Sequence, residues 1–224
     1  MKNEMTTKFD NSGAFRKYVV EFVGTFFLMI SVVMAVSGGL GQFAPIAIGC
    51  MLTVMVYAGG HISGAHYNPA VSLAIYLRGK LNGGDLLPYM VAQFLGGTLA
   101  VMLAGFLLES MGIPEPTPKV LDIFPSLIAE IIGTFALVFV ILNVATANRT
   151  AGNSYYGLAI GFTVLACAYA FGVVSGGAFN PAVALGITMA GFTSWASIWI
   201  YLIGTFTGGA LAAFLFQYVN GPEI

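Results

Sequence analysis

The chain has 224 residues, of which 58% are hydrophobic and only 8% are charged. Soluble domains carry about 25% charged residues, so this chain has too few charges to solvate the surface of a folded soluble protein. A net charge of −1 excludes the basic surface of a nucleic-acid-binding protein, and the two Cys and two His lack the spacing of metal ligands. We therefore expect an integral membrane protein, surrounded by membrane lipid, with no metal and no cofactor.

Six apolar blocks in chain order are long enough to cross a bilayer, which takes about 20 residues of helix. They lie at 16–37, 43–62, 86–108, 125–146, 156–174 and 195–219. Stretches rich in Gly, Asn and Pro separate the blocks and predict turns. Two further apolar segments begin at Asn68 and Asn180, but at roughly ten residues each they are too short to span.

The first block follows several basic residues, a pattern shared with secretory leaders. We expect a retained helix instead, because the block is longer than the apolar core of a leader and contains Glu21, which has a counterpart later in the chain. The two cysteines, Cys50 and Cys167, lie in apolar blocks. They are expected to be reduced, packed thiols and not a disulfide framework.

The basic residues predict the orientation, because cytoplasmic loops carry an excess of Lys and Arg. With six spans, every basic residue except Lys119 falls on one side of the membrane, which we assign to the cytoplasm together with both termini. These residues are Lys2, Lys8, Arg16, Lys17, Arg78, Lys80 and Arg149. The expected location is a cell membrane, either a plasma or an inner membrane.

The chain repeats itself internally. Three sequence blocks of the first half recur in the same order in the second half. The pairs are EFVGTF at Glu21–Phe26 with EIIGTF at Glu130–Phe135, SGAHYNPAVSL at Ser63–Leu73 with SGGAFNPAVAL at Ser175–Leu185, and FLGGTLA at Phe94–Ala100 with FTGGALA at Phe206–Ala212. Each half holds three spans, so the second half must enter the membrane from the opposite side, as an inverted repeat. We expect one domain over 1–224, with repeats at 16–108 and 125–219 and an extracytoplasmic connecting loop at 109–124.

The two short segments each open with Asn-Pro-Ala. Asn is a good N-cap, and Pro suits the first helical position, so each segment should be a half-helix that starts near the midplane. Two helix N-termini place positive partial charge there, which repels cations and protons. The stretches before each Asn are expected to be extended, with their carbonyls lining a pore. The residues concerned are Asn68, Pro69, Ala70, Asn180, Pro181 and Ala182, with carbonyls from Gly64, Ala65, His66, Gly176 and Ala178.

The sequence resembles the aquaporin and aquaglyceroporin channels, the major intrinsic proteins. The residues that carry the resemblance are HISGAHYNPAV at His61–Val71, SGGAFNPAV at Ser175–Val183 and the two Glu-x-x-Gly-Thr-Phe blocks. The resemblance implies an all-α membrane protein of six transmembrane helices and two re-entrant half-helices. It also implies a homotetramer with one pore per subunit, and no enzyme activity.

One position departs from the family pattern. Most members have an arginine three residues after the second Asn, at the outer constriction, whereas this chain has Val183. Carrying the other filter positions over by spacing gives Ile48, Ala168 and Gly177. This small, apolar set predicts a wide filter that admits small polyols, urea, ammonia or undissociated metalloid acids. The alternative is that Val183 changes little and the channel is selective for water.

Glu21 and Glu130 lie in otherwise apolar helices, where an unpaired charge is costly. They could form a proton relay or an ion site, but we expect them to anchor the re-entrant loops by accepting backbone N–H bonds. His61 and His66 are likewise expected to be structural. An ion site would favour a secondary transporter with inverted repeats. An intramembrane enzyme is a further alternative, but the spans contain no Ser–His or paired Asp arrangement. A structural junction protein of the same fold, with a closed pore, would pass no solute.

Overall fold

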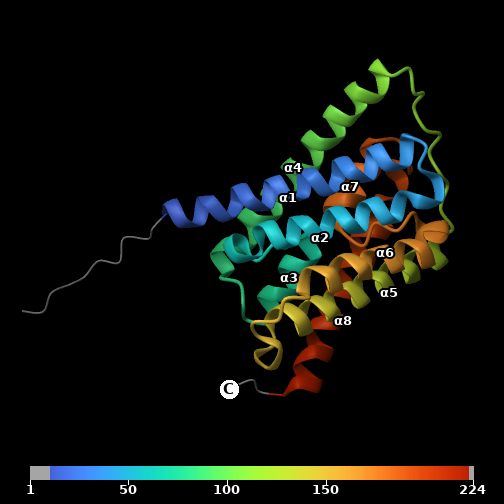
Figure 1. The fold of residues 1–224 in the computed structure, drawn as a ribbon. Coiled ribbons are helices and arrows are strands. Elements are labelled where there is room, and N and C mark those ends of the chain that lie inside the picture. The colour runs from blue at the N-terminus through green and yellow to red at the C-terminus, as the bar shows by residue number, and fades with distance from the viewer. Residues whose placement is uncertain (1–10, 222–224) are drawn as a thin grey trace, which may run out of the picture.

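The computed structural model describes residues 11–221 as a bundle of six long helices around two short ones (Figure 1). Lys2 and Lys8 therefore lie outside the described residues. The helices are α1 Asn11–Ser37, α2 Ala44–Ser63, α3 Pro69–Leu77, α4 Gly83–Ser110, α5 Ile123–Ile141, α6 Tyr156–Ser175, α7 Pro181–Met189 and α8 Ile198–Asn220. Six segments are long and apolar enough to cross a membrane, at Gly13–Ser37, Gly41–Ser63, Gly83–Ser110, Ile123–Thr146, Tyr156–Ser175 and Trp195–Asn220. These match the six predicted blocks, and residues 11–221 contain no β-strand.

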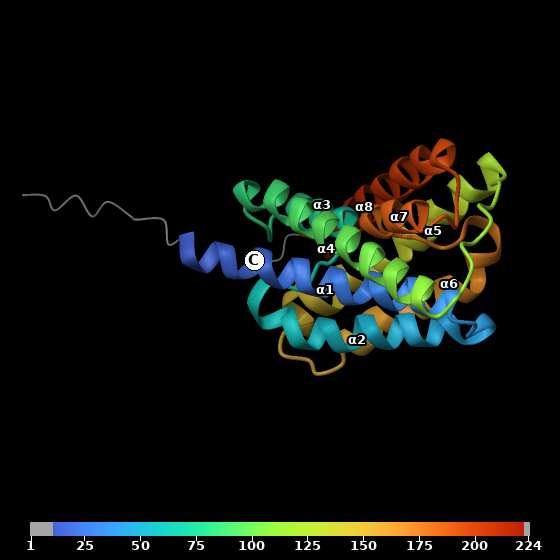
Figure 2. The same ribbon diagram turned by 90° about the horizontal axis from the view of Figure 1, so that it is seen from above.

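The two halves of the chain run in opposite directions. In Figure 1 α1 runs from left to right, whereas its counterpart α5 runs from right to left. The contacts repeat with this inversion, because α1 packs on α4 as α5 packs on α8, and α3 packs on α8 as α7 packs on α4. Each half-helix is thus held by the last long helix of the other half. Figure 2, the view from above, shows α7 beside α8 and the segment after α4 running back to α5.

Glycines allow the long helices to touch at their backbones. A Cβ on Gly96 would lie 2.3 Å from the carbonyl oxygen of Phe22, and a Cβ on Gly208 would lie 2.4 Å from that of Ile131. Both distances are far below van der Waals contact, so no larger residue fits without separating α4 from α1 or α8 from α5. The paired Gly-Gly motifs of the sequence therefore serve helix packing, and they do so at equivalent places in the two halves.

One expectation about local structure needs correction. Cys167 is buried as predicted, but Cys50 is exposed on the surface of the bundle, because α2 turns this position away from its neighbours. Both thiols are free.

The block 125–146 is α-helical only to Ile141 and ends in a π-helical turn at Leu142–Thr146. The Thr146 hydroxyl and the Asn143 amide donate to backbone carbonyls there, at distances of 2.6 and 2.7 Å.

Candidate functional site

The two half-helices begin as the Asn-Pro-Ala motifs predict. Asn68 and Asn180 both have extended backbone (φ −157° and −160°) and precede a Pro in the first turn. The Oδ1 atom of Asn68 accepts the N–H of Ala70 at 2.9 Å, and that of Asn180 accepts the N–H of Ala182 at 2.9 Å. Each Asn therefore caps its half-helix, and Pro occupies a position where its missing N–H costs nothing.

The loops that lead into these caps are not extended, contrary to the prediction. Gly64 and Gly176 both have φ of +89°, and Ala65 and Gly177 follow with φ of +52° and +69°. A left-handed conformation at Ala65 is costly for a residue with a Cβ, so the surrounding contacts must hold it. The glycines of the two loops were the only feature of the sequence that could have predicted this left-handed backbone.

The caps are linked to each other across the centre of the bundle. The Nδ2 atom of Asn68 donates to the carbonyl of Phe179 at 2.9 Å, and the Nδ2 atom of Asn180 donates to the carbonyl of Tyr67 at 2.8 Å. An amide carries two N–H donors, so one donor of each Asn remains for other partners. The reciprocal bonds fix the two helix starts side by side, and this arrangement brings their positive ends together.

In the first half, Glu21 fixes the loop in front of Asn68. Its carboxylate accepts the backbone N–H groups of His66 at 2.9 Å and Tyr67 at 2.7 Å. It also accepts the hydroxyl of Ser63 at 2.7 Å and the side-chain amide of Gln93 at 2.8 Å. The group is fully buried, and its acceptor capacity is used by these four bonds.

Glu130 repeats the arrangement in the second half. It accepts the N–H groups of Ala178 at 3.0 Å and Phe179 at 2.7 Å and the Ser175 hydroxyl at 2.6 Å. Each carboxyl therefore accepts backbone N–H groups of the loop in front of a cap. The four bonds to Glu21 use its acceptor sites, whereas the three bonds to Glu130 leave about one. Because both buried carboxyls are bonded to the loops, their burial is no longer evidence for the ion site that a secondary transporter would need.

Sequence reasoning missed three further anchoring residues. The hydroxyl of Tyr89 donates to the carbonyl of Ser63 at 2.8 Å, and Tyr201, 112 positions later, donates in the same way to Ser175. Gln93 has no such counterpart, and its Nε2 atom bridges Glu21 and Ser72. The repeat offset could have identified the two tyrosines, because both precede the Gly-Gly motifs by the same distance.

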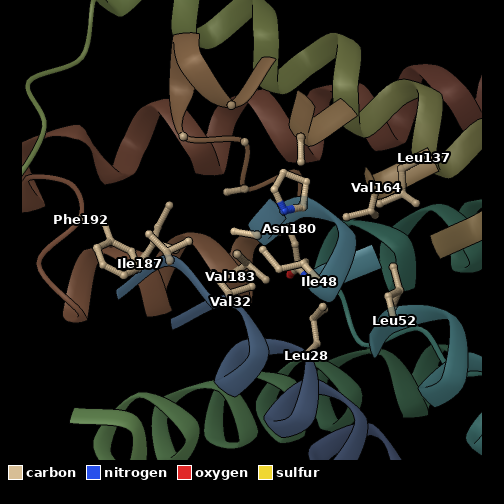
Figure 3. A pocket seen from close by; sticks show the side chains of 18 of the residues that line it. Leu28, Val32, Ile48, Leu52, Leu137, Val164, Asn180, Val183, Ile187 and Phe192 are labelled. Carbon is tan, nitrogen blue, oxygen red and sulfur yellow. The ribbon is translucent and has the colours of Figure 1, made fainter. Parts of the chain in front are cut away.

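A cavity of about 580 Å³ runs past the two caps, and all four predicted filter positions line it. Ile48, Ala168, Gly177 and Val183 share this cavity with Asn68 and Asn180. Figure 3 shows Ile187 and Phe192 at one end and Leu52, Leu137 and Val164 at the other, with Asn180 and Val183 between them. Of the residues predicted to line the pore with their carbonyls, Ala65, His66, Gly176 and Ala178 line the cavity, whereas Gly64 does not.

One end of the cavity lies beside the segment that connects α4 to α5, and we call it the loop-side mouth. It is lined there by Pro116, Thr117 and Lys119, together with Phe192 and Thr193. At the level of the half-helices, His66 is a polar residue of the cavity lining, and its Nδ1 lies 3.0 Å from the Ser72 hydroxyl. His61 is exposed near the end of α2 and does not line the cavity.

The apolar lining follows the repeat, which the sequence reading did not anticipate. Val71 and Val183 each stand three residues after a capping Asn, and both line the cavity. The matched pairs Leu28 with Leu137, Ile48 with Ile160, and Leu52 with Val164 do the same. The cavity is thus mostly apolar, and the polar residues Asn68, Asn180 and His66 line it where the half-helices meet.

Comparison with known proteins agrees with this architecture. A family model described as major intrinsic protein matches residues 5–216. The chain belongs to this family. It is 40% identical to aquaporin NIP1-1 of Zea mays over 222 residues, which cover 92% of this chain and 77% of the maize protein. It is 31% identical to aquaporin AqpM of Methanothermobacter thermautotrophicus, with 92% and 97% covered. The X-ray structure of the aquaglyceroporin from Plasmodium falciparum superposes with a TM-score of 0.81 at 24% identity, covering 93% and 98% of the two chains.

Members of the major intrinsic protein family are passive channels for water and small solutes, and this chain is therefore a channel and not an enzyme. Its relatives carry both the aquaporin and the aquaglyceroporin names, so the family leaves the choice of solute open.

Mercury should distinguish the predicted filter position Ala168 from the natural cysteines. Cys50 and Cys167 do not line the cavity, whereas Ala168 does. We expect HgCl₂ to leave the flux of the parent unchanged but to reduce that of Ala168→Cys at least fivefold, reversibly with a thiol, because the adduct stands in the path. Stopped-flow light scattering on proteoliposomes measures this. Block of the parent that survives removal of both natural cysteines, or an insensitive Ala168→Cys channel, would contradict the assignment.

Proposed function

We propose that this major intrinsic protein is a permissive channel for water and for small uncharged solutes. The candidate solutes are small polyols, urea, ammonia and undissociated metalloid acids. One observation carries the proposal: Ile48, Ala168, Gly177 and Val183 line one cavity, and none of them bears a charge or a side-chain hydrogen-bond donor. A constriction without the bulk and charge of an arginine is wider and discriminates less by hydrogen bonding.

Exclusion of ions is proposed to rest on the centre of the channel. The two half-helix N-termini and the free donors of Asn68 and Asn180 meet there, and their positive partial charge disfavours cations and hydronium. The proposed assembly is a homotetramer in a cell membrane with both termini cytoplasmic. The described basic residues support that orientation, because Lys119 alone stands apart from the others.

Flux measurements on purified protein in liposomes test the proposal. Shrinkage and reswelling under gradients of sucrose, glycerol, urea and arsenite would give the permeability for water and for each solute. We expect at least one solute larger than water to pass well above the empty-liposome background, with proton conductance far below solute flux. High water flux with glycerol, urea and arsenite all at background would instead establish a water-selective channel.

A further inference from the structure

Lys119 brings a charge to a cavity that is otherwise uncharged. It lies on the segment between α4 and α5 and lines the loop-side mouth together with Thr117 and Phe192. Among the described residues that line this cavity, it is the only Lys, Arg, Asp or Glu. Sequence reasoning used Lys119 only as the exception to the orientation rule, and nothing in the pattern placed it at the channel mouth.

The ammonium group is held in a defined place. Lys119 Nζ donates to the carbonyl oxygens of Val173 at 2.6 Å and Val174 at 3.4 Å, at the C-terminal end of α6. Its backbone N–H donates to the carbonyl of Phe192 at 2.9 Å, and Lys119 pairs with Thr193 in an isolated parallel bridge. The residue is exposed, and an ammonium has three donors, so one donor remains beyond the bonds to Val173 and Val174.

The connecting segment as a whole carries the opposite net charge. Segment 109–124 contains three acidic residues, Glu109, Glu115 and Asp122, against the single Lys119, which gives a local net charge of −2. None of the three acids lines the cavity. An exposed charge acts over about 8 Å at physiological ionic strength, so inside the mouth the nearest fixed charge decides the sign of the potential.

We propose that Lys119 makes the loop-side mouth electropositive, so that cations are rejected in the vestibule before they reach the uncharged filter. Val183 leaves the constriction without a positive charge, and Lys119 on the connecting segment places one at the entrance instead. Neutral solutes pass this point unaffected, and small anions are concentrated at it. The inference concerns the potential at the mouth and does not depend on which neutral solute permeates.

The electrostatic potential at the loop-side mouth can be measured by an assay that does not depend on solute flux. A chain with Cys50→Ser and Cys167→Ala would carry a single reporter, Thr117→Cys, because Thr117 is exposed and lines the mouth. The reporter's rates of reaction with an anionic and a cationic methanethiosulfonate reagent give a ratio that reports the local sign of charge. Removing one nearby positive charge by Lys119→Met should lower the anionic-to-cationic ratio about fivefold to thirtyfold at low salt.

Matched variants separate charge from structure. Lys119→Arg should keep the ratio of the parent, and Lys80→Met, which removes a lysine between α3 and α4, should leave it unchanged. At about 1 M salt the Debye length falls to about 3 Å, so the difference between parent and Lys119→Met should nearly vanish. The proposal is overturned if Lys119→Met stays within twofold of the parent at low salt, or if a difference persists at 1 M salt. Should Lys119→Met not yield folded protein, the salt dependence of the parent ratio decides alone, and a flat dependence rejects the proposal.

Discussion

Replacing Glu130 with alanine is expected to destroy the folded channel or to lower its melting temperature by about 10 °C. The substitution strands three buried donors, the N–H groups of Ala178 and Phe179 and the hydroxyl of Ser175. Each buried donor without a partner costs about 1–3 kcal/mol, and 1 kcal/mol corresponds to about 2–4 °C for a chain of this size. The loop would no longer hold Asn180 at the centre, so flux should be lost together with stability.

The experiment compares thermal melting in detergent, followed by size-exclusion chromatography, with flux in liposomes. Glu130→Gln keeps one acceptor oxygen and should fall between the parent and Glu130→Ala. Glu115→Ala, at an exposed acid of the connecting segment, should melt like the parent. Glu21→Ala should cost at least as much as Glu130→Ala, because Glu21 accepts four bonds, including one from Gln93. A Glu130→Ala channel that melts within 2 °C of the parent and conducts normally would refute the anchoring role.

Val183→Arg is expected to convert the permeability profile. The position is buried to 6% exposure and lines the cavity next to the caps, so a long cationic side chain there must occupy the path. We expect fluxes of urea and glycerol to fall at least tenfold, while water flux falls by less than threefold, because water is small enough to pass the narrowed filter. Stopped-flow measurements on matched proteoliposomes give both fluxes from the same preparation.

A size-matched control separates the two ways in which arginine could act. Val183→Met adds length without charge, so a loss of urea flux shared by both variants would assign the effect to width, and a loss confined to Val183→Arg would assign it to charge. Equal urea flux in the parent and Val183→Arg would show that Val183 does not lie at the limiting constriction. Both variants leave the anchoring carboxylates and the caps untouched.

Much of this architecture could be predicted from short sequence features. The spans follow from the length of their apolar runs, and the half-helices from Asn as a cap and Pro in the first turn. The inversion follows from an odd number of spans in each half, and the anchoring role of Glu21 and Glu130 follows from the cost of an unpaired charge among apolar residues. The filter positions came from resemblance to a family, and the cavity contains all four of them.

Other features could not be derived from the sequence because they depend on contacts between distant residues. The left-handed backbone at Tyr67 is held by Glu21 from another helix, so no local propensity predicts it. The reciprocal bonds of Asn68 and Asn180 to each other's loops require the two halves to meet, and the position of Lys119 at the mouth requires the connecting segment to fold back onto α6.

The sequence by itself thus determined that this protein is an inverted-repeat channel, because length, periodicity and capping act within short stretches of chain. It also singled out Val183 as a predicted filter residue, and the cavity lining includes it. Only the tertiary structure decided which side chains face the path and where the charge at its entrance stands. Those properties arise where residues more than 50 positions apart, such as Lys119 and Val173, come within hydrogen-bonding distance.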